Sequence, residues 1–195
     1  MHGLINKSIQ SFLSDTYGPE VWQASVRGAG LPISGFEALV IYDDDMTLAV
    51  VDAAGGQLEK TREELLEDLG NYLVSHKNLE PLRRLLRFGG VNFVEFLYSL
   101  DDLHDRARLA VPDLELPHLA LEDLGNGEFR LCSSFRVPGF GHILVGLLRS
   151  MADDYGALVF LNYERSEGAR EFLKITLLES QFAKGRVFEL AARVG

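Results

Sequence analysis

One histidine occupies a position in the sequence where a helix would normally place an apolar core residue. Four apolar residues recur at the spacing of one buried helix face: Phe93, Phe96, Leu97 and Leu100. His104 follows at the next step of the same pattern. An imidazole at such a position is either a hydrogen-bonded core group or a metal ligand. The core histidine is the more common outcome for an isolated helix, so the helix alone leaves both interpretations open.

The kind of metal site can be narrowed from the remaining residues. A structural zinc site needs about four ligands at paired spacings, and the sequence has no C-x-x-C or H-x-x-x-H pair. The other histidines are scattered along the chain: His2, His76, His118 and His142. A single histidine can still hold haem iron, because the porphyrin supplies the four equatorial ligands.

A second polar pair could bind the carboxylates that a haem carries. The segment CSSFR, residues 132–136, has the character of a strand, and Ser134 and Arg136 lie two residues apart on one face of it. A hydroxyl and a planar guanidinium suit a propionate. The alternative is an ordinary exposed strand face.

The pattern along the chain predicts an α+β protein, with helical N-terminal two thirds packed on a small C-terminal antiparallel sheet with an inserted helix. Helices are expected at 2–17, 19–30, 43–56, 61–77, 79–90, 93–108 and 141–156, and strands at 128–137, 157–164 and 171–179. The β-branched residues of 43–56 also permit a strand there. Residues 165–170 are expected to form the turn of the last hairpin. Pro112 and Pro117 predict an extended connection before the sheet.

We expect one domain over residues 1–180 and a tail, 181–195, that is compatible with a final helix. The formal net charge of −10 disfavours nucleic acid and anionic membranes as partners. The single cysteine, Cys132, excludes an internal disulfide and favours a reducing, cytoplasmic location. No signal peptide or membrane-length apolar run is evident. The motifs G-x-S-x-G, G-x-G-x-x-G and the P-loop are missing, so we do not expect an enzyme.

Several motifs, in order, resemble those of the H-NOX (haem nitric oxide/oxygen binding) domains, the family that includes the haem domain of soluble guanylate cyclase. The opening MHGLINKSI is similar to the family's M-x-G-x-(I/V)-N start, SLDDLH to the segment carrying the proximal histidine, and VPDLELP to the connection after it. CSSFR stands where the family has Tyr-x-Ser-x-Arg. The resemblance spans about residues 1–180 and implies the family's fold.

The resemblance also implies a site that binds haem b (iron protoporphyrin IX). It makes His104 the iron ligand, packs Pro117 against the porphyrin, and assigns the propionates to Ser134 and Arg136. Cys132 departs from the family pattern, since it replaces the motif's tyrosine and a thiol is a weaker donor than a phenol.

The ligand side of the haem is expected to be apolar. Ile5 and Leu144 are predicted to lie there, together with Phe140 and Ile143. The segment 137–148 lacks the tyrosine with which oxygen-binding members of the family hold dioxygen, so NO and CO are the expected ligands. His142 is the one residue of this segment that could donate a hydrogen bond if it faced the pocket.

The function implied by the resemblance is that of a stand-alone NO sensor. Its proximal histidine is expected to be released from the iron, and the resulting signal is expected to pass to a separate partner protein. A histidine kinase or a cyclic-dinucleotide signalling enzyme is the expected partner. The alternative from the same resemblance is an interaction module with weak or no haem binding, which the Cys132 substitution favours.

Overall fold

The computed structural model describes residues 1–180; the tail 181–195, where a helix was considered, lies outside the described residues. The helices and strands in chain order are α1 (Gly3–Tyr17), α2 (Pro19–Gly28), α3 (Asp44–Leu58), α4 (Arg62–Ser75), the short 3-10 helix η1 (Lys77–Leu79), α5 (Glu80–Arg87), α6 (Phe93–Tyr98), the 3-10 helix η2 (Ser99–Asp102), α7 (Leu103–Ala110), β1 (His118–Gly125), β2 (Glu128–Ser134), α8 (Phe140–Tyr155), β3 (Leu158–Glu167) and β4 (Arg170–Glu179). The α+β class predicted from the sequence is confirmed, and 43–56 is helical as part of α3.

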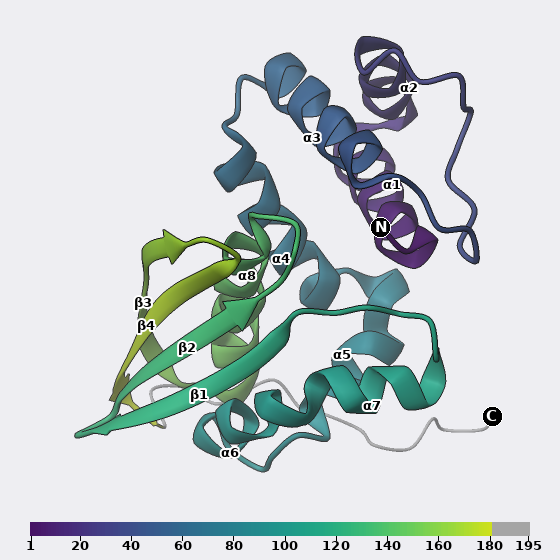
Figure 1. The fold of residues 1–195 in the computed structure, drawn as a ribbon. Helices are drawn as coiled ribbons and strands as arrows, with labels where there is room; N and C mark the ends of the chain where they lie inside the picture. The colour runs from purple at the N-terminus through teal and green to yellow at the C-terminus, as the bar shows by residue number, and fades with distance from the viewer. Residues whose placement is uncertain (181–195) are drawn as a thin grey trace, which may run out of the picture.

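The molecule has two parts, joined by α4 (Figure 1). Helices α1 to α3 form a group of their own around one apolar cluster, which includes Phe12, Trp22 and Val50. The sheet, α8 and α5 to α7 form the other part around a second cluster. No helix in the described part of the chain is long and apolar enough to cross a membrane.

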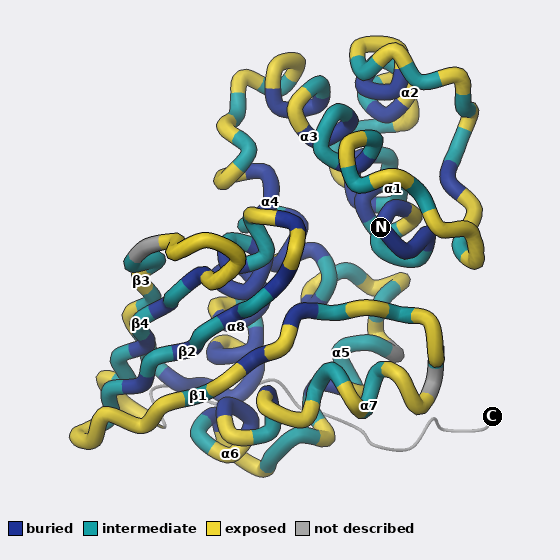
Figure 2. Tube along the Cα trace, in the orientation of Figure 1, coloured by how far each residue is buried: buried dark blue, intermediate teal, exposed yellow. Residues whose placement is uncertain are grey.

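Within the described residues the sheet has four strands in the order β1-β2-β4-β3, with every neighbouring pair antiparallel. Leu131, Leu173 and Ile175 belong to the buried core on the inner face of the sheet, and in Figure 2 buried positions alternate with less buried ones along β2 and β4. The first strand, β1, was not predicted. The hairpin of β3 and β4 is also longer than predicted, because the strands run to Glu167 and Arg170 where a turn over 165–170 was expected.

Helices α4 and α8 cross at two glycines. A Cβ atom built on Gly146 would lie 1.9 Å from the Glu67 carbonyl oxygen, and one built on Gly70 would lie 2.0 Å from the Ile143 carbonyl oxygen. Both distances are far inside van der Waals contact, so the two backbones touch at a place where only glycine fits. This crossing fixes α8 between α4 and the sheet.

We therefore expect Gly146→Ala to destabilise the fold by about 1–3 kcal/mol or more, since the helices must separate to admit the methyl group. Gly56→Ala in α3 is the matched control. Its Cβ would meet nothing within 4 Å, and an alanine in a helix gains about 0.5–1 kcal/mol over glycine. Chemical denaturation of both variants measures their free energies of unfolding and so tests this prediction. Equal free energies of unfolding would contradict the close packing.

The helix predicted over 93–108 is not one regular helix. Asn92 caps its start and accepts a hydrogen bond from the Glu95 backbone N–H at 3.0 Å. The 3-10 turns of η2 then separate α6 from α7. Because the 3-10 segment has a different number of residues per turn, the apolar stripe that ends at Leu100 is not continued by His104. Leu100 is fully buried, whereas His104 is only half-buried.

Candidate functional site

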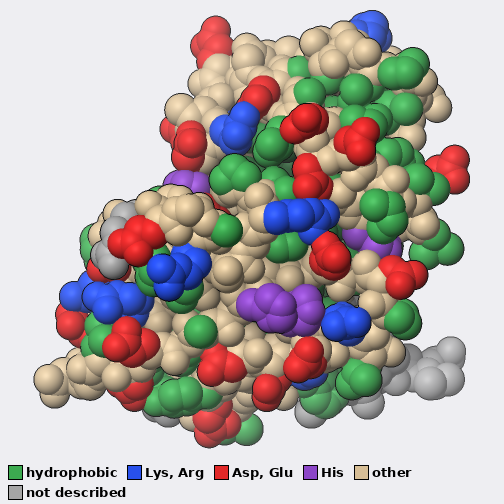
Figure 3. All heavy atoms as spheres, viewed as in Figure 1, with side chains coloured by type: hydrophobic (Ala, Val, Ile, Leu, Met, Phe, Trp, Pro, Cys, Tyr) green, Lys and Arg blue, Asp and Glu red, His purple; other side chains and the backbone are tan. Residues whose placement is uncertain are grey.

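A pocket of about 860 Å³ lies between the N-terminal helices and the rest of the molecule. This volume falls within the range of roughly 300–1,000 Å³ that is common for small-molecule sites. Its lining residues are His2, Ile41, His104, Arg108, Pro112, Asp113, Glu115, Leu116, His118, Ser134, Phe135, Arg136 and Ala169. On the face of the molecule seen in Figure 3, histidine side chains gather between basic and acidic ones.

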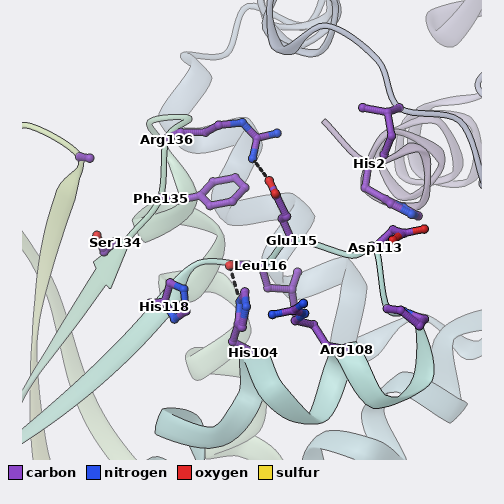
Figure 4. A pocket seen from close by; sticks show the side chains of 13 residues that line it. His2, His104, Arg108, Asp113, Glu115, Leu116, His118, Ser134, Phe135 and Arg136 are labelled. Carbon is purple, nitrogen blue, oxygen red and sulfur yellow. Dashed lines mark hydrogen bonds and ion pairs between the residues drawn. The ribbon is translucent and has the colours of Figure 1, made fainter.

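His104 stands in the first turn of α7 and lines this pocket. Its Nδ1 lies 2.8 Å from the backbone carbonyl oxygen of Leu116, as Figure 4 shows. A carbonyl can only accept, so Nδ1 carries the proton and donates it. The neutral ring therefore has its lone pair on Nε2, which is the arrangement that metal-binding histidines use.

Arg136 follows β2 and lies at the pocket's edge beside Ser134. Its Nε and Nη2 donate to the Asp44 carboxylate at 2.8 and 3.1 Å, and its Nη1 pairs with Glu115. Burial alone would raise the pKa of Asp44, but hydrogen bonds from Arg136 and the N-terminal ammonium outweigh it and hold that pKa below its usual range. The guanidinium is thus fixed in place by α3 and by the connection before β1.

The opening motif of the chain fixes the N-terminal helices to the same point. The Met1 ammonium donates to Asp44 Oδ1 at 2.6 Å. A Cβ on Gly3 would lie 2.0 Å from the Glu37 carbonyl oxygen, and the fully buried Asn6 accepts a hydrogen bond from Thr47 Oγ1 at 2.7 Å. The motif's glycine and asparagine therefore hold α1 against the segment that carries Asp44.

Two further histidines line the pocket, and the sequence analysis gave neither a role. His2 is only 5% exposed and caps α1 through Nδ1, which accepts from the Leu4 N–H at 3.2 Å. His118 begins β1, and its ring stacks on His104 with ring centroids 4.1 Å apart. His2 belongs to the opening motif and His118 directly follows Pro117, so proximity to motif residues was the only clue in the sequence.

Three other residues predicted for the site are not among the residues that line the pocket. Pro117 is buried directly between two lining residues, Leu116 and His118. Ile5 packs against both the apolar cluster of the N-terminal helices and the small cluster of Met1, Phe135 and Val137. Leu144 is 3% exposed inside the core beneath the sheet. The structure thus brings together His104, Ser134 and Arg136.

Cys132 lies on the same face of β2 as Ser134, with Ala120 and Phe172 opposite it on the neighbouring strands. It is half-buried and is not among the residues that line the pocket. Burial raises the pKa of its thiol, with a smaller opposing effect from Arg170. The group is therefore a protonated thiol at neutral pH.

His142 faces away from this pocket. Its ring stacks on Tyr163 with ring centroids 4.2 Å apart, and its Nδ1 lies 3.6 Å from Glu67 Oε1. It lines a separate hollow of about 140 Å³ beside Glu171. Burial and the Glu171 carboxylate raise the pKa of Tyr163 to about 12. His142 is thus engaged with α4 and β3 in this structure.

Comparison with known proteins identifies the family to which the chain belongs. The haem-NO-binding family model matches residues 2–161. Among solved structures, an H-NOX mutant of T. tengcongensis superimposes with a TM-score of 0.75 at 17% identity, covering 92% of this chain and 99% of that one. An H-NOX mutant from K. algicida gives a TM-score of 0.76 at 19% identity, covering 92% of this chain and 97% of the other. The chain therefore belongs to the haem-NO-binding (H-NOX) family, whose sensor domains are not themselves catalytic.

The curated relatives are longer proteins. Soluble guanylate cyclase gcy-34 of Caenorhabditis elegans is 28% identical over 78% of this chain and 23% of its own length. Soluble guanylate cyclase 89Da of Drosophila melanogaster is 23% identical over 84% of this chain and 24% of its own length. The chain thus spans about a quarter of each of these relatives.

The residues present fit a haem. An imidazole whose Nδ1 donates to a backbone carbonyl suits an axial iron ligand. A serine hydroxyl and an arginine at the same pocket suit the propionates. Ser134 and Arg136 match two of the three residues of the Tyr-x-Ser-x-Arg motif, and Cys132 stands where the motif has tyrosine.

Arg136→Ala is expected to speed haem loss without unfolding the chain. The Arg136 side chain is 44% exposed, and an exposed ion pair is worth about 0–1 kcal/mol, so the release rate should rise by up to about fivefold. Cys132→Tyr should slow release, if the phenol reaches a propionate. Transfer of haem to an acceptor protein measures both rates.

Glu115→Gln is the matched control, because it removes a carboxylate that pairs with Arg136. We expect it to release haem no faster than the unchanged protein. An Arg136→Ala protein that releases haem at the native rate would remove Arg136 from the site.

Proposed function

We propose that this chain is a haem-based nitric oxide sensor, with His104 as the iron ligand of a bound haem b. The observation that carries the proposal is the orientation of His104, whose Nδ1 is tied to the Leu116 carbonyl while its ring lines a pocket shared with Ser134 and Arg136. When bound, the haem would supply an iron centre that takes up NO, and we propose that this uptake releases His104.

The chain's own residues would carry the signal. His104 lies in the first turn of α7, a short helix that ends in the connection 111–117. Release of its ring would free one anchor of α7. Arg136 links the end of β2 to α3 through Asp44, so a movement of the Arg136 side chain would be transmitted to the N-terminal helices. These are two arrangements with different surfaces, which a switch requires.

We further propose that the signal passes, in the cytoplasm, to a separate histidine kinase or cyclic-dinucleotide signalling enzyme. Excess acidic charge suits a basic docking surface on such a partner. Assays of candidate kinases with the reduced protein, with and without NO, test this step. A kinase whose autophosphorylation is unchanged by either form is not the partner.

The test of the sensor itself is an absorption spectrum of the purified, reduced protein before and after NO. A haem band that shifts on NO addition to the position of a five-coordinate nitrosyl supports the proposal. A haem band that stays six-coordinate with NO would refute histidine release.

The second candidate is an H-NOX-fold interaction module with weak or no haem binding. Two observations favour it: Cys132 in place of the motif's tyrosine, and the Glu115 carboxylate already paired with Arg136. A protein that stays colourless after haem is added in slight excess and removed by gel filtration would support this candidate.

A further inference from the structure

The imidazole of His104 is held on two sides by one short segment, residues 116–118. The Leu116 carbonyl oxygen accepts from its Nδ1 at 2.8 Å. The His118 ring stacks on its face, with ring centroids 4.1 Å apart and an angle of 28° between the ring planes. Figure 4 shows the three groups together at the base of the pocket, with His104 coming from α7 and His118 from the start of β1.

The local sequence explains why Leu116 and His118 can both contact the His104 ring. Proline has a fixed φ, and it restricts the residue before it to extended backbone. Successive residues of an extended chain point to opposite sides. Pro117 is buried, so Leu116 and His118 on either side of it both line the pocket. The pairing of His118 with Ser134 then fixes the segment to the sheet.

The two contacts restrain different motions of the His104 ring. A hydrogen bond at Nδ1 fixes the direction of one ring edge but leaves the ring free to rock about that direction. A stacked neighbour fixes the plane of the ring. With both in place, the direction of the Nε2 lone pair is determined.

We propose that His118 is a positioning residue, which with the Leu116 carbonyl forms a clip that sets the orientation of the His104 imidazole. This inference rests on the proposed function, since its consequence is for an iron ligand. The clip joins α7 to the start of β1. A His104 ring that is not bound to iron would therefore keep both of these neighbours and its orientation.

The experiment uses the full chain and three variants. His118→Ala removes the stacked ring, and His118→Phe keeps an aromatic face without nitrogen atoms. Asp113→Asn is the matched control, because Asp113 lines the same pocket and no contact between it and His104 is recorded among the described residues. The first measurement is made without haem, as the NMR resonances of the His104 ring protons, which a stacked ring shifts.

The second measurement is the iron–histidine stretching band of the reduced, haem-loaded protein. We expect His118→Ala to move the His104 proton resonances and to broaden or shift the stretching band, while His118→Phe and Asp113→Asn leave both near the native values. NO should also convert the His118→Ala protein to the five-coordinate form about two- to tenfold faster, the factor that loss of an aromatic pair corresponds to.

Unchanged His104 resonances and an unchanged stretching band in His118→Ala would overturn the clip. The two arms separate this failure from failure of the proposed function. If the protein binds no haem, the haem-free NMR arm still reports whether the rings stack, and shifted resonances there would keep the contact while removing its role toward iron.

Discussion

His104→Gly is expected to lose bound haem during purification and to regain it when imidazole is supplied. If His104 is the iron ligand as proposed, the substitution would remove the protein's bond to the iron and leave room for a small ring in its place. Free imidazole can fill that space and bind the iron in the same position. The measurement is haem occupancy by absorption, with and without imidazole. Full occupancy and an unchanged spectrum without imidazole would show that His104 is not the ligand.

The structure makes one control necessary that the sequence did not suggest. The other histidines are scattered along the sequence, whereas in the structure the His118 ring lies in contact with the His104 ring. The double variant His104→Gly/His118→Ala separates the two. If the single variant retains some haem and the double variant retains none, His118 is a substitute ligand. If both lose haem equally, His104 acts alone.

The helical part of the fold could be predicted because its signals are local. Thr61 and Glu64 form the capping box that their spacing predicts, with both hydrogen bonds present. Asn92 caps α6 for the same reason. Local signals did not decide between helix and strand for 43–56, because its β-branched residues disfavour a helix. The helix is stabilised instead by packing against α2 and by the apolar cluster that includes Val50 and Val51.

The parts that could not be predicted depend on contacts between distant residues. β1 has a weak alternating pattern, with Leu119 buried but Glu122 and Asp123 exposed, so it becomes a strand only through its pairing with β2. The break at η2 places His104 off the core face, and no propensity of SLDD predicts it. The pairing of Arg136 with Asp44, 92 positions away in the sequence, could not be predicted from local sequence patterns either.

The ferrous protein is expected to bind NO and CO and to form no long-lived oxygen complex in air. Bound dioxygen draws negative charge from the iron, and a hydrogen-bond donor stabilises that charge by about 1.5–3 kcal/mol, or roughly 10- to 100-fold in affinity. NO is far less polar and gains little from a donor. The start of α8 offers Phe140, which packs on the pocket residue Phe135 with ring centroids 5.0 Å apart, and His142 is turned toward Tyr163.

One donor in the pocket bears on this prediction. His2 accepts the Leu4 N–H through Nδ1, so its neutral ring carries the proton on Nε2 and can donate. The test is the spectrum of reduced protein mixed with air, for the unchanged chain, for His2→Phe and for Phe140→Tyr. We expect rapid oxidation without a stable oxygen complex in the first two, and a longer-lived complex when Phe140→Tyr adds a hydroxyl early in α8.

A stable oxygen complex in the unchanged chain would overturn the prediction, and the variants would then identify the donor. Loss of that complex in His2→Phe would assign it to His2. Its persistence would exclude His2 and direct attention to the remaining polar groups of the pocket, since His142 is held against Tyr163 and Glu67 on the far side of α8's first turn. The apolar lining residues Ile41 and Phe135 cannot donate a hydrogen bond to a bound ligand, so any donor must come from the polar residues that line the same pocket.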